Sequence, residues 1–198
     1  MTWYWYVLIV VIVGLLVFWK GVSVARRLDR LNTTLLKSRR VLEHALQARA
    51  RYAMEFAHTP DIDVASALIL TDSAQQAMDA SMFPIVDDGL DEIRGSRQEF
   101  LKGSYGQSNT VRERIKAEEF LTHTLRYAVD DMATDNLSRA GARIYPQLEQ
   151  ARINVRMART FYNSHVFQAQ RLWKKPLVRI FRLAGHTSTP QRIDFDDE

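Results

Sequence analysis

The sequence contains no cysteine, and neither proline nor glycine interrupts residues 22–59. Without cysteine the chain has no disulfide bond, no thiolate nucleophile and no cysteine-ligated zinc, and nothing points to an oxidising compartment. Alternation of apolar and polar residues is also scarce, and β-branched runs occur only near the N-terminus. These absences favour helices over strands and predict an all-α protein.

Acidic residues are absent between Glu149 and Asp194, where nine basic residues fall. The length of 198 residues is enough for one folded domain and a small appendage. A composition of 46% hydrophobic and 25% charged residues is typical of a folded protein with a hydrophobic core. The net charge of +4 is unevenly spread: residues 20–51 and 151–198 are basic, while residues 52–150 carry nine bases and seventeen acids. The chain therefore has two basic ends and an acidic middle.

The first twenty residues, MTWYWYVLIVVIVGLLVFWK, carry no charged side chain before Lys20. Seventeen helical residues, from Trp3 to Trp19, rise ~25 Å, the short end of what a bilayer core requires. Trp3, Trp5 and Trp19 place aromatic rings where headgroups lie at both ends of such a span. We therefore predict a transmembrane anchor over residues 1–22.

A buried core helix or a cleaved signal peptide would also be apolar at the N-terminus. A buried core helix is disfavoured because the segment has no polar face. A cleaved signal peptide is the stronger alternative, because Ser23-Val24-Ala25 has the small-x-small form of a cleavage site. Against it, only the N-terminal amine precedes the apolar run, whereas a signal peptide has a basic n-region.

Basic residues follow the apolar segment but do not precede it. Lys20, Arg26 and Arg27 come directly after it, and further bases follow. The positive-inside rule then places the N-terminus outside and the body of a single-pass inner-membrane protein in the cytoplasm. We expect these three residues to contact the membrane together with the aromatic rings of the anchor.

The remainder of the chain shows helical spacing of apolar residues. The first helix continues from the anchor to Pro60, and its expected inner residues are Val24, Leu28, Leu31, Leu35, Val41, Ala45, Ala48 and Tyr52. The second helix covers residues 61–81, with Val64, Leu68, Met78 and Met82 expected inside, and Asp61 or Asp63 as its cap. After Pro84 and Gly89 a short helix is expected up to Leu101, followed by a loop over residues 102–110 and a third helix over 111–134.

The fourth helix has the most regular pattern. Apolar positions recur with gaps of four and three at Ile144, Leu148, Ala151, Val155, Ala158, Tyr162, His165, Ala169 and Leu172. Such a heptad stripe is typical of a long helix packed at a small angle against its neighbours. The pattern predicts an antiparallel four-helix bundle over residues 23–173, followed by a tail over residues 174–198.

In an antiparallel bundle the fourth helix returns toward the membrane, so the tail should lie near the bilayer. Its basic and aromatic residues are typical of an interfacial segment, and each base near an anionic leaflet contributes ~1 kcal/mol of attraction. The expected membrane contacts here are Trp173, Lys174, Lys175, Arg179, Phe181 and Arg182. The alternative is that the aliphatic residues pack on the end of the bundle and the bases are solvated.

Two segments resemble the LemA family of bacterial membrane-tethered helical proteins. The first contains Leu148-Glu149, Arg152-Ile153, Ala158-Arg159 and Tyr162-Asn163; the second contains Pro176, Leu177-Val178 and Phe181, and the IDFDDE terminus is similar to the family's aromatic-acid end. Residues 60–135 depart from the family, so the chain would be a divergent member. The resemblance implies a four-helix bundle on a membrane anchor and carries over no catalytic residue.

No catalytic, cofactor-binding or metal-binding residue is predicted. A di-iron bundle needs two Glu-x-x-His motifs, and only Glu55 to His58 has that spacing. No nucleophile elbow, phosphate loop or dinucleotide fingerprint is present. The arginine stripe of Arg152, Arg156 and Arg159 could follow phosphates, but pairing with acids of neighbouring helices is favoured, so nucleic acid is not expected as a partner.

The sequence therefore predicts a membrane-anchored scaffold or interaction module that is not an enzyme. Arg159, Tyr162 and Asn163 are its candidate interaction residues. The expected partners are anionic inner-leaflet lipids, an unidentified protein, and a second copy of the chain in a homo-oligomer. The alternative function is membrane organisation through the basic aromatic C-terminal segment.

Overall fold

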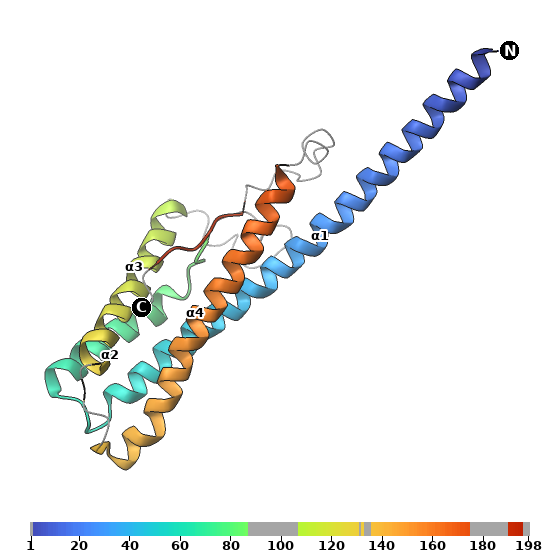
Figure 1. Cartoon of the computed structure of the whole chain (residues 1–198). Coiled ribbons are helices and arrows are strands. Elements are labelled where there is room, and N and C mark those ends of the chain that lie inside the picture. Colours follow the sequence, from blue (N-terminus) through green and yellow to red (C-terminus); the bar gives the residue numbers. More distant parts are fainter. Residues whose placement is uncertain (1, 87–106, 131, 133–135, 175–189, 196–198) are drawn as a thin grey trace.

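The computed structural model describes residues 2–86, 107–130, 132, 136–174 and 190–195. The described part is all-α, as predicted, and consists of α1 (Thr2–Ala57), α2 (Val64–Ala80), α3 (Gln107–Leu125), the π-helix η3 (Arg126–Asp130) and α4 (Arg139–Trp173). The second half of α1 lies antiparallel to α4, and the shorter α2 and α3 complete the bundle (Figure 1).

Helix α1 runs without interruption from Thr2 to Ala57, so the predicted anchor and the first helix of the bundle are one element. Its first half projects beyond the bundle as a single helix (Figure 1). Its second half buries a heptad of Leu28, Leu35, Leu42, Arg49 and Phe56.

Beyond Leu35 the predicted inner stripe of α1 is wrong at Val41, which is 60% exposed, whereas Ala45 and Tyr52 are partly buried against the core at the edge of the buried face. The prediction shifted the apolar stripe by about one residue to include Val41, Ala45 and Ala48. A continuous helix has no such shift in phase, and Leu42 and Leu46 therefore face the core.

Helix α2 buries a different face from the one predicted, although Met78, which was expected inside, is partly buried against the core. Val64 and Leu68, expected inside, are 87% and 71% exposed, and Met82 after the helix is exposed as well. The buried face consists instead of Leu70, Ser73, Ala74 and Ala77. Small residues at these positions let α2 approach its neighbours closely, which favours this face over one of bulkier side chains.

Two helix boundaries also differ from the prediction. The expected loop over residues 102–110 is shorter at its C-terminal side, because α3 already begins at Gln107. Regular α-helix ends at Leu125 and continues as η3 to Asp130, instead of running unchanged to residue 134. A short helix expected before Leu101 lies outside the described residues.

The stripe predicted for α4 is confirmed at all its apolar positions. His165 is half-buried at the edge of the stripe, and Val166 takes the place in the core. One core cluster contains residues of α1 and α4 together with Ile85, Val86, Ile193 and Phe195. The other surrounds Phe56 and contains residues from the C-terminal end of α1, from α2, α3 and η3, and from the N-terminal part of α4. Residues 190–195 of the predicted tail therefore pack into the bundle.

Candidate functional site

Among the described residues, hardly any part of the chain covers the apolar first half of α1. Trp3 and Trp19 are 75% and 73% exposed, and the aliphatic side chains described between them are exposed too. This is the one helix of the described chain that is long and apolar enough to cross a membrane, although a signal sequence has the same properties. Exposed apolar surface of this extent requires a nonpolar environment or a partner.

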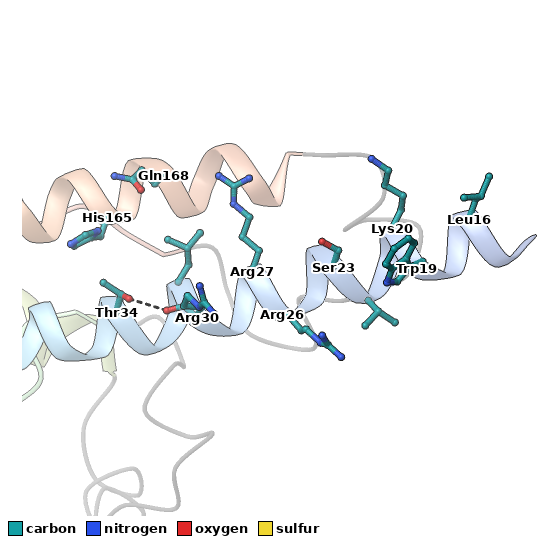
Figure 2. A pocket seen from close by; sticks show the side chains of 12 residues that line it. Leu16, Trp19, Lys20, Ser23, Arg26, Arg27, Arg30, Thr34, His165 and Gln168 are labelled. Carbon is teal, nitrogen blue, oxygen red and sulfur yellow. Dashed lines mark hydrogen bonds between the residues drawn. The ribbon is translucent and has the colours of Figure 1, made fainter. Parts of the chain in front are cut away.

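A basic groove lies where this exposed segment enters the bundle. It has a volume of about 970 Å³ between α1 and the C-terminal part of α4. Its basic residues are Lys20, Arg26, Arg27 and Arg30 from α1, and α4 contributes His165 and Gln168. Leu16, Trp19 and Val22 give one end of the groove an apolar wall. Figure 2 shows Arg27 reaching from α1 toward α4, whereas Arg26 points away from it.

The positive charge of the groove is not neutralised by the described residues. No acidic side chain in the described part of the chain lines it, and the exposed Asp29 lies outside the lining. None of the four basic groups forms an ion pair with a described carboxylate, and the buried Nδ1 atom of His165 has no hydrogen-bond partner there. The groove can therefore accept an anion without breaking an existing contact.

The structure locates part of the predicted membrane-contact set. Lys20, Arg26 and Arg27 line the groove, while Trp3 and Trp5 lie far out on the projecting helix. At the end of α4, Trp173 is half-buried and Lys174 is exposed. The other four predicted contacts lie outside the described residues: Lys175, Arg179, Phe181 and Arg182.

The predicted interaction residues hold the chain's own C-terminal segment. Asn163 donates from Nδ2 to the carbonyl of Ile193 at 2.8 Å and accepts from the Ile193 N–H at 3.0 Å. The Tyr162 hydroxyl donates to the carbonyl of Gln191 at 3.1 Å. The Arg159 guanidinium donates to the carbonyl of Phe195 and lies over its ring, 5.5 Å from the centroid. These contacts define a tail clamp that fixes residues 190–195 along α4.

A buried ionic cluster joins α1 to α3. The Glu118 carboxylate accepts from Arg49 at 2.8 Å and from Arg114 at 2.9 Å, and all three side chains are at most 2% exposed. Arg49 also donates to Thr122 Oγ1 at 2.9 Å. Burial lowers the pKa of Arg114, although Glu118 opposes this effect. Glu118 is the carboxylate that both arginines bind, and Glu43 also acts on Arg114 through its charge, so the cluster depends mainly on Glu118 for its stability.

Exposed and partly exposed ion pairs connect α4 to η3. Arg152 on α4 pairs with Asp130 of η3 at 2.9 Å and with Glu149 at 2.7 Å, and the hydrogen bond to Asp130 is the main reason that the pKa of Arg152 is raised. This confirms pairing with a neighbouring acid for one arginine of the predicted stripe. Arg156, in the same stripe, is exposed.

The chain uses its two candidate cap residues differently. Asp63 is the N-cap of α2 and accepts from the N–H groups of Ala65 and Ser66. Asp61 instead accepts from the backbone N–H and the hydroxyl of Ser138, both at 2.6 Å, at the start of α4. These hydrogen bonds lower the pKa of Asp61.

Among the described residues no three His, Asp or Glu side chains converge on a point where a metal could bind. His58 donates from Nδ1 to the carbonyl of Met54, 2.6 Å away, directly after the last residue of α1.

Comparison with protein-family models, with curated proteins and with solved structures finds no significant match to this chain. The similarity to the LemA family therefore stays a prediction based on its motifs. In the structure, Arg159, Tyr162 and Asn163 of the first motif contact residues 190–195, which overlap the IDFDDE terminus.

Sequence reasoning missed Arg30, His165 and Gln168 as parts of the basic groove. Arg30 had a detectable signal, because Lys20, Ser23, Arg27, Arg30 and Thr34 are spaced by three or four residues and so share one helix face. The two α4 residues had none, since only the register of α4 against α1 places them opposite this face.

Proposed function

We propose that this chain is a single-pass protein of the bacterial inner membrane, with its N-terminus outside and a cytoplasmic helical bundle that acts as a scaffold or interaction module, without catalysis. The observation that carries the proposal is the continuity of α1, whose first half is exposed and apolar and whose second half is part of the core. One unbroken helix would hold the bundle at a fixed distance and orientation from the bilayer.

The orientation can be tested because the chain has no cysteine. Single-cysteine variants Thr2→Cys and Val64→Cys would be labelled in intact cells with a membrane-impermeant maleimide. We expect labelling at position 2 before lysis and at position 64 only after the inner membrane is permeabilised. Labelling of position 64 in intact cells, or loss of the first residues from the mature chain, would contradict the proposal.

The exposed apolar face of α2 supports a role in protein contacts. Val64, Leu68 and Ile69 on this face are exposed although their side chains are aliphatic. A photoreactive residue in place of Leu68 should give a discrete protein adduct in cells, whereas the same residue in place of the exposed, polar Gln47 should not. Equal adducts from both positions, or none from Leu68, would count against an interaction module.

The second candidate, membrane organisation, is favoured by the direction of α4. Its C-terminal part lies beside residues of α1 that follow the apolar segment, so Lys174 lies at the end of the bundle from which that segment projects (Figure 1). In a chain that lacks residues 1–22, binding to anionic vesicles should then depend on residues 174–185. Binding that survives their deletion would exclude this function for the segment.

A further inference from the structure

We infer that the basic groove between α1 and α4 binds the phosphate headgroup of an anionic phospholipid. This inference rests on the membrane span of the proposed function and assigns a ligand to the place where the span meets the bundle. It concerns described residues of α1 and α4 and is independent of residues 175–189.

The first argument is charge. Lys20, Arg26, Arg27 and Arg30 line one groove, and no carboxylate lies among its lining residues. Arginine side chains bind phosphate through two parallel N–H donors, which a single ammonium group cannot provide. Lys20, Arg27 and Arg30 share one helix face by their spacing, so their charges can act on one ligand.

The second argument is the contribution of α4. His165 and Gln168 close the groove from the opposite side, and the Nδ1 atom of His165 is buried without a hydrogen-bond partner among the described residues. A buried nitrogen without a partner is unfavourable unless a ligand or water supplies one. The exposed Gln168 amide can donate to a phosphate oxygen in the groove, and the His165 ring can do so through Nδ1 when that atom carries a proton and the ring moves to expose it.

The third argument identifies a lipid as the source of the phosphate. Leu16, Trp19 and Val22 form the apolar end of the groove, and they continue the exposed apolar surface of α1. Trp19 and Lys20 form the boundary of the uncharged segment, where headgroups would lie if this segment crosses the bilayer. A ligand that fits must be anionic at one end and apolar at the other, as a phospholipid is and a free phosphate ion is not.

The test uses the full chain in a neutral detergent, with bound lipid counted by native mass spectrometry. Phosphatidylglycerol, phosphatidylcholine and inorganic phosphate are added separately. We expect phosphatidylglycerol to be retained in preference to phosphatidylcholine, and we expect the double variant Arg27→Gln/Arg30→Gln to bind it about tenfold more weakly. Arg27 and Arg30 are both exposed, so the double variant should keep the thermal unfolding temperature of the wild type.

The matched control is Lys37→Gln/Arg40→Gln. It removes two exposed bases at the same spacing from the same helix, outside the groove, and should bind phosphatidylglycerol like the wild type. Unchanged binding by the groove variant, or an equal loss in both variants, would overturn the inference. Displacement of the lipid by an equal concentration of inorganic phosphate would overturn its assignment to a lipid. The cysteine labelling described above tests the span separately, so failure of one proposal can be told from failure of the other.

Discussion

Single residues with buried charge determine how the bundle is held together. Glu118 lies between Arg49 and Arg114, and all three are almost completely buried. A buried charge is tolerated only when it is paired, because it has lost its hydration. Both arginines bind the one carboxylate of Glu118, so they depend on Glu118 more than Glu118 depends on either of them.

We expect Glu118→Gln to destabilise the protein by about 3–5 kcal/mol, because it removes the carboxylate that both buried arginines bind. Arg49→Met should cost less, about 1–2 kcal/mol, because the Glu118–Arg114 pair stays neutral. Urea unfolding of the full chain in neutral detergent measures both, with the exposed Glu113→Gln as the control. A larger loss from Arg49→Met than from Glu118→Gln would contradict this description of the cluster.

Asp61 predicts a pH dependence of stability. Its hydrogen bonds from Ser138 lower its pKa below the usual 3.8, so its contribution is present above that pH and is lost as the pH falls through the lowered pKa. Asp61→Asn should therefore lower the unfolding temperature at pH 7, and the difference from the wild type should shrink below pH 3.8. A difference that is constant from pH 7 to pH 3 would show that the charge of Asp61 plays no part.

Gly141 is required at the start of α4 because its neighbour is the same carboxylate. A Cβ atom at this position would overlap the Asp61 side chain. Gly141→Ala should therefore destabilise the protein, although alanine is normally favoured over glycine within a helix. In the Asp61→Asn background the added loss should remain, because asparagine has the same shape; disappearance of the loss there would point to charge instead of steric overlap.

At the scale of elements, periodicity predicted α4 well and α2 poorly. The α4 stripe repeats with gaps of four and three over the whole helix, and this regularity identifies the buried face although Ile153, Met157 and Phe161 form a second apolar row that is exposed. In α2, Val64 and Leu68 on one face compete with Leu70, Ala74 and Ala77 on another, and the sequence of α2 does not show which face its neighbours accept. The place of Ile193 against Asn163, thirty residues earlier, depends on tertiary packing that local pattern cannot show.

The tail clamp gives a prediction at this scale. Asn163→Ala should cost about 2 kcal/mol, because it leaves the N–H and the carbonyl of Ile193 without partners. Asn154→Ala, an exposed change of the same type on the same helix, should cost less than about 0.5 kcal/mol. Equal unfolding free energies for the two variants would mean that residues 190–195 add little to the stability of the bundle.

At the scale of the whole molecule, one helix contains both the exposed apolar segment and part of the bundle core. The apolar composition of the span and three of the groove's basic residues, Lys20, Arg26 and Arg27, could be predicted from the sequence because both are local properties of α1. The groove itself could not, because it requires the register of α4 against α1. If the apolar segment and the bundle part of α1 form one rigid helix, this continuity alone places the groove at the level of the headgroups.

The most direct test of this continuity is a spin-label scan of positions 10–30 of the cysteine-free chain in lipid vesicles, with accessibility to oxygen and to a water-soluble nickel complex measured at each position. We expect oxygen accessibility to dominate through position 19, nickel accessibility to rise after Lys20, and one uninterrupted helical period across the boundary. Nickel accessibility throughout positions 10–19, or a break in the period between positions 19 and 30, would contradict a membrane-embedded helix that continues into the bundle.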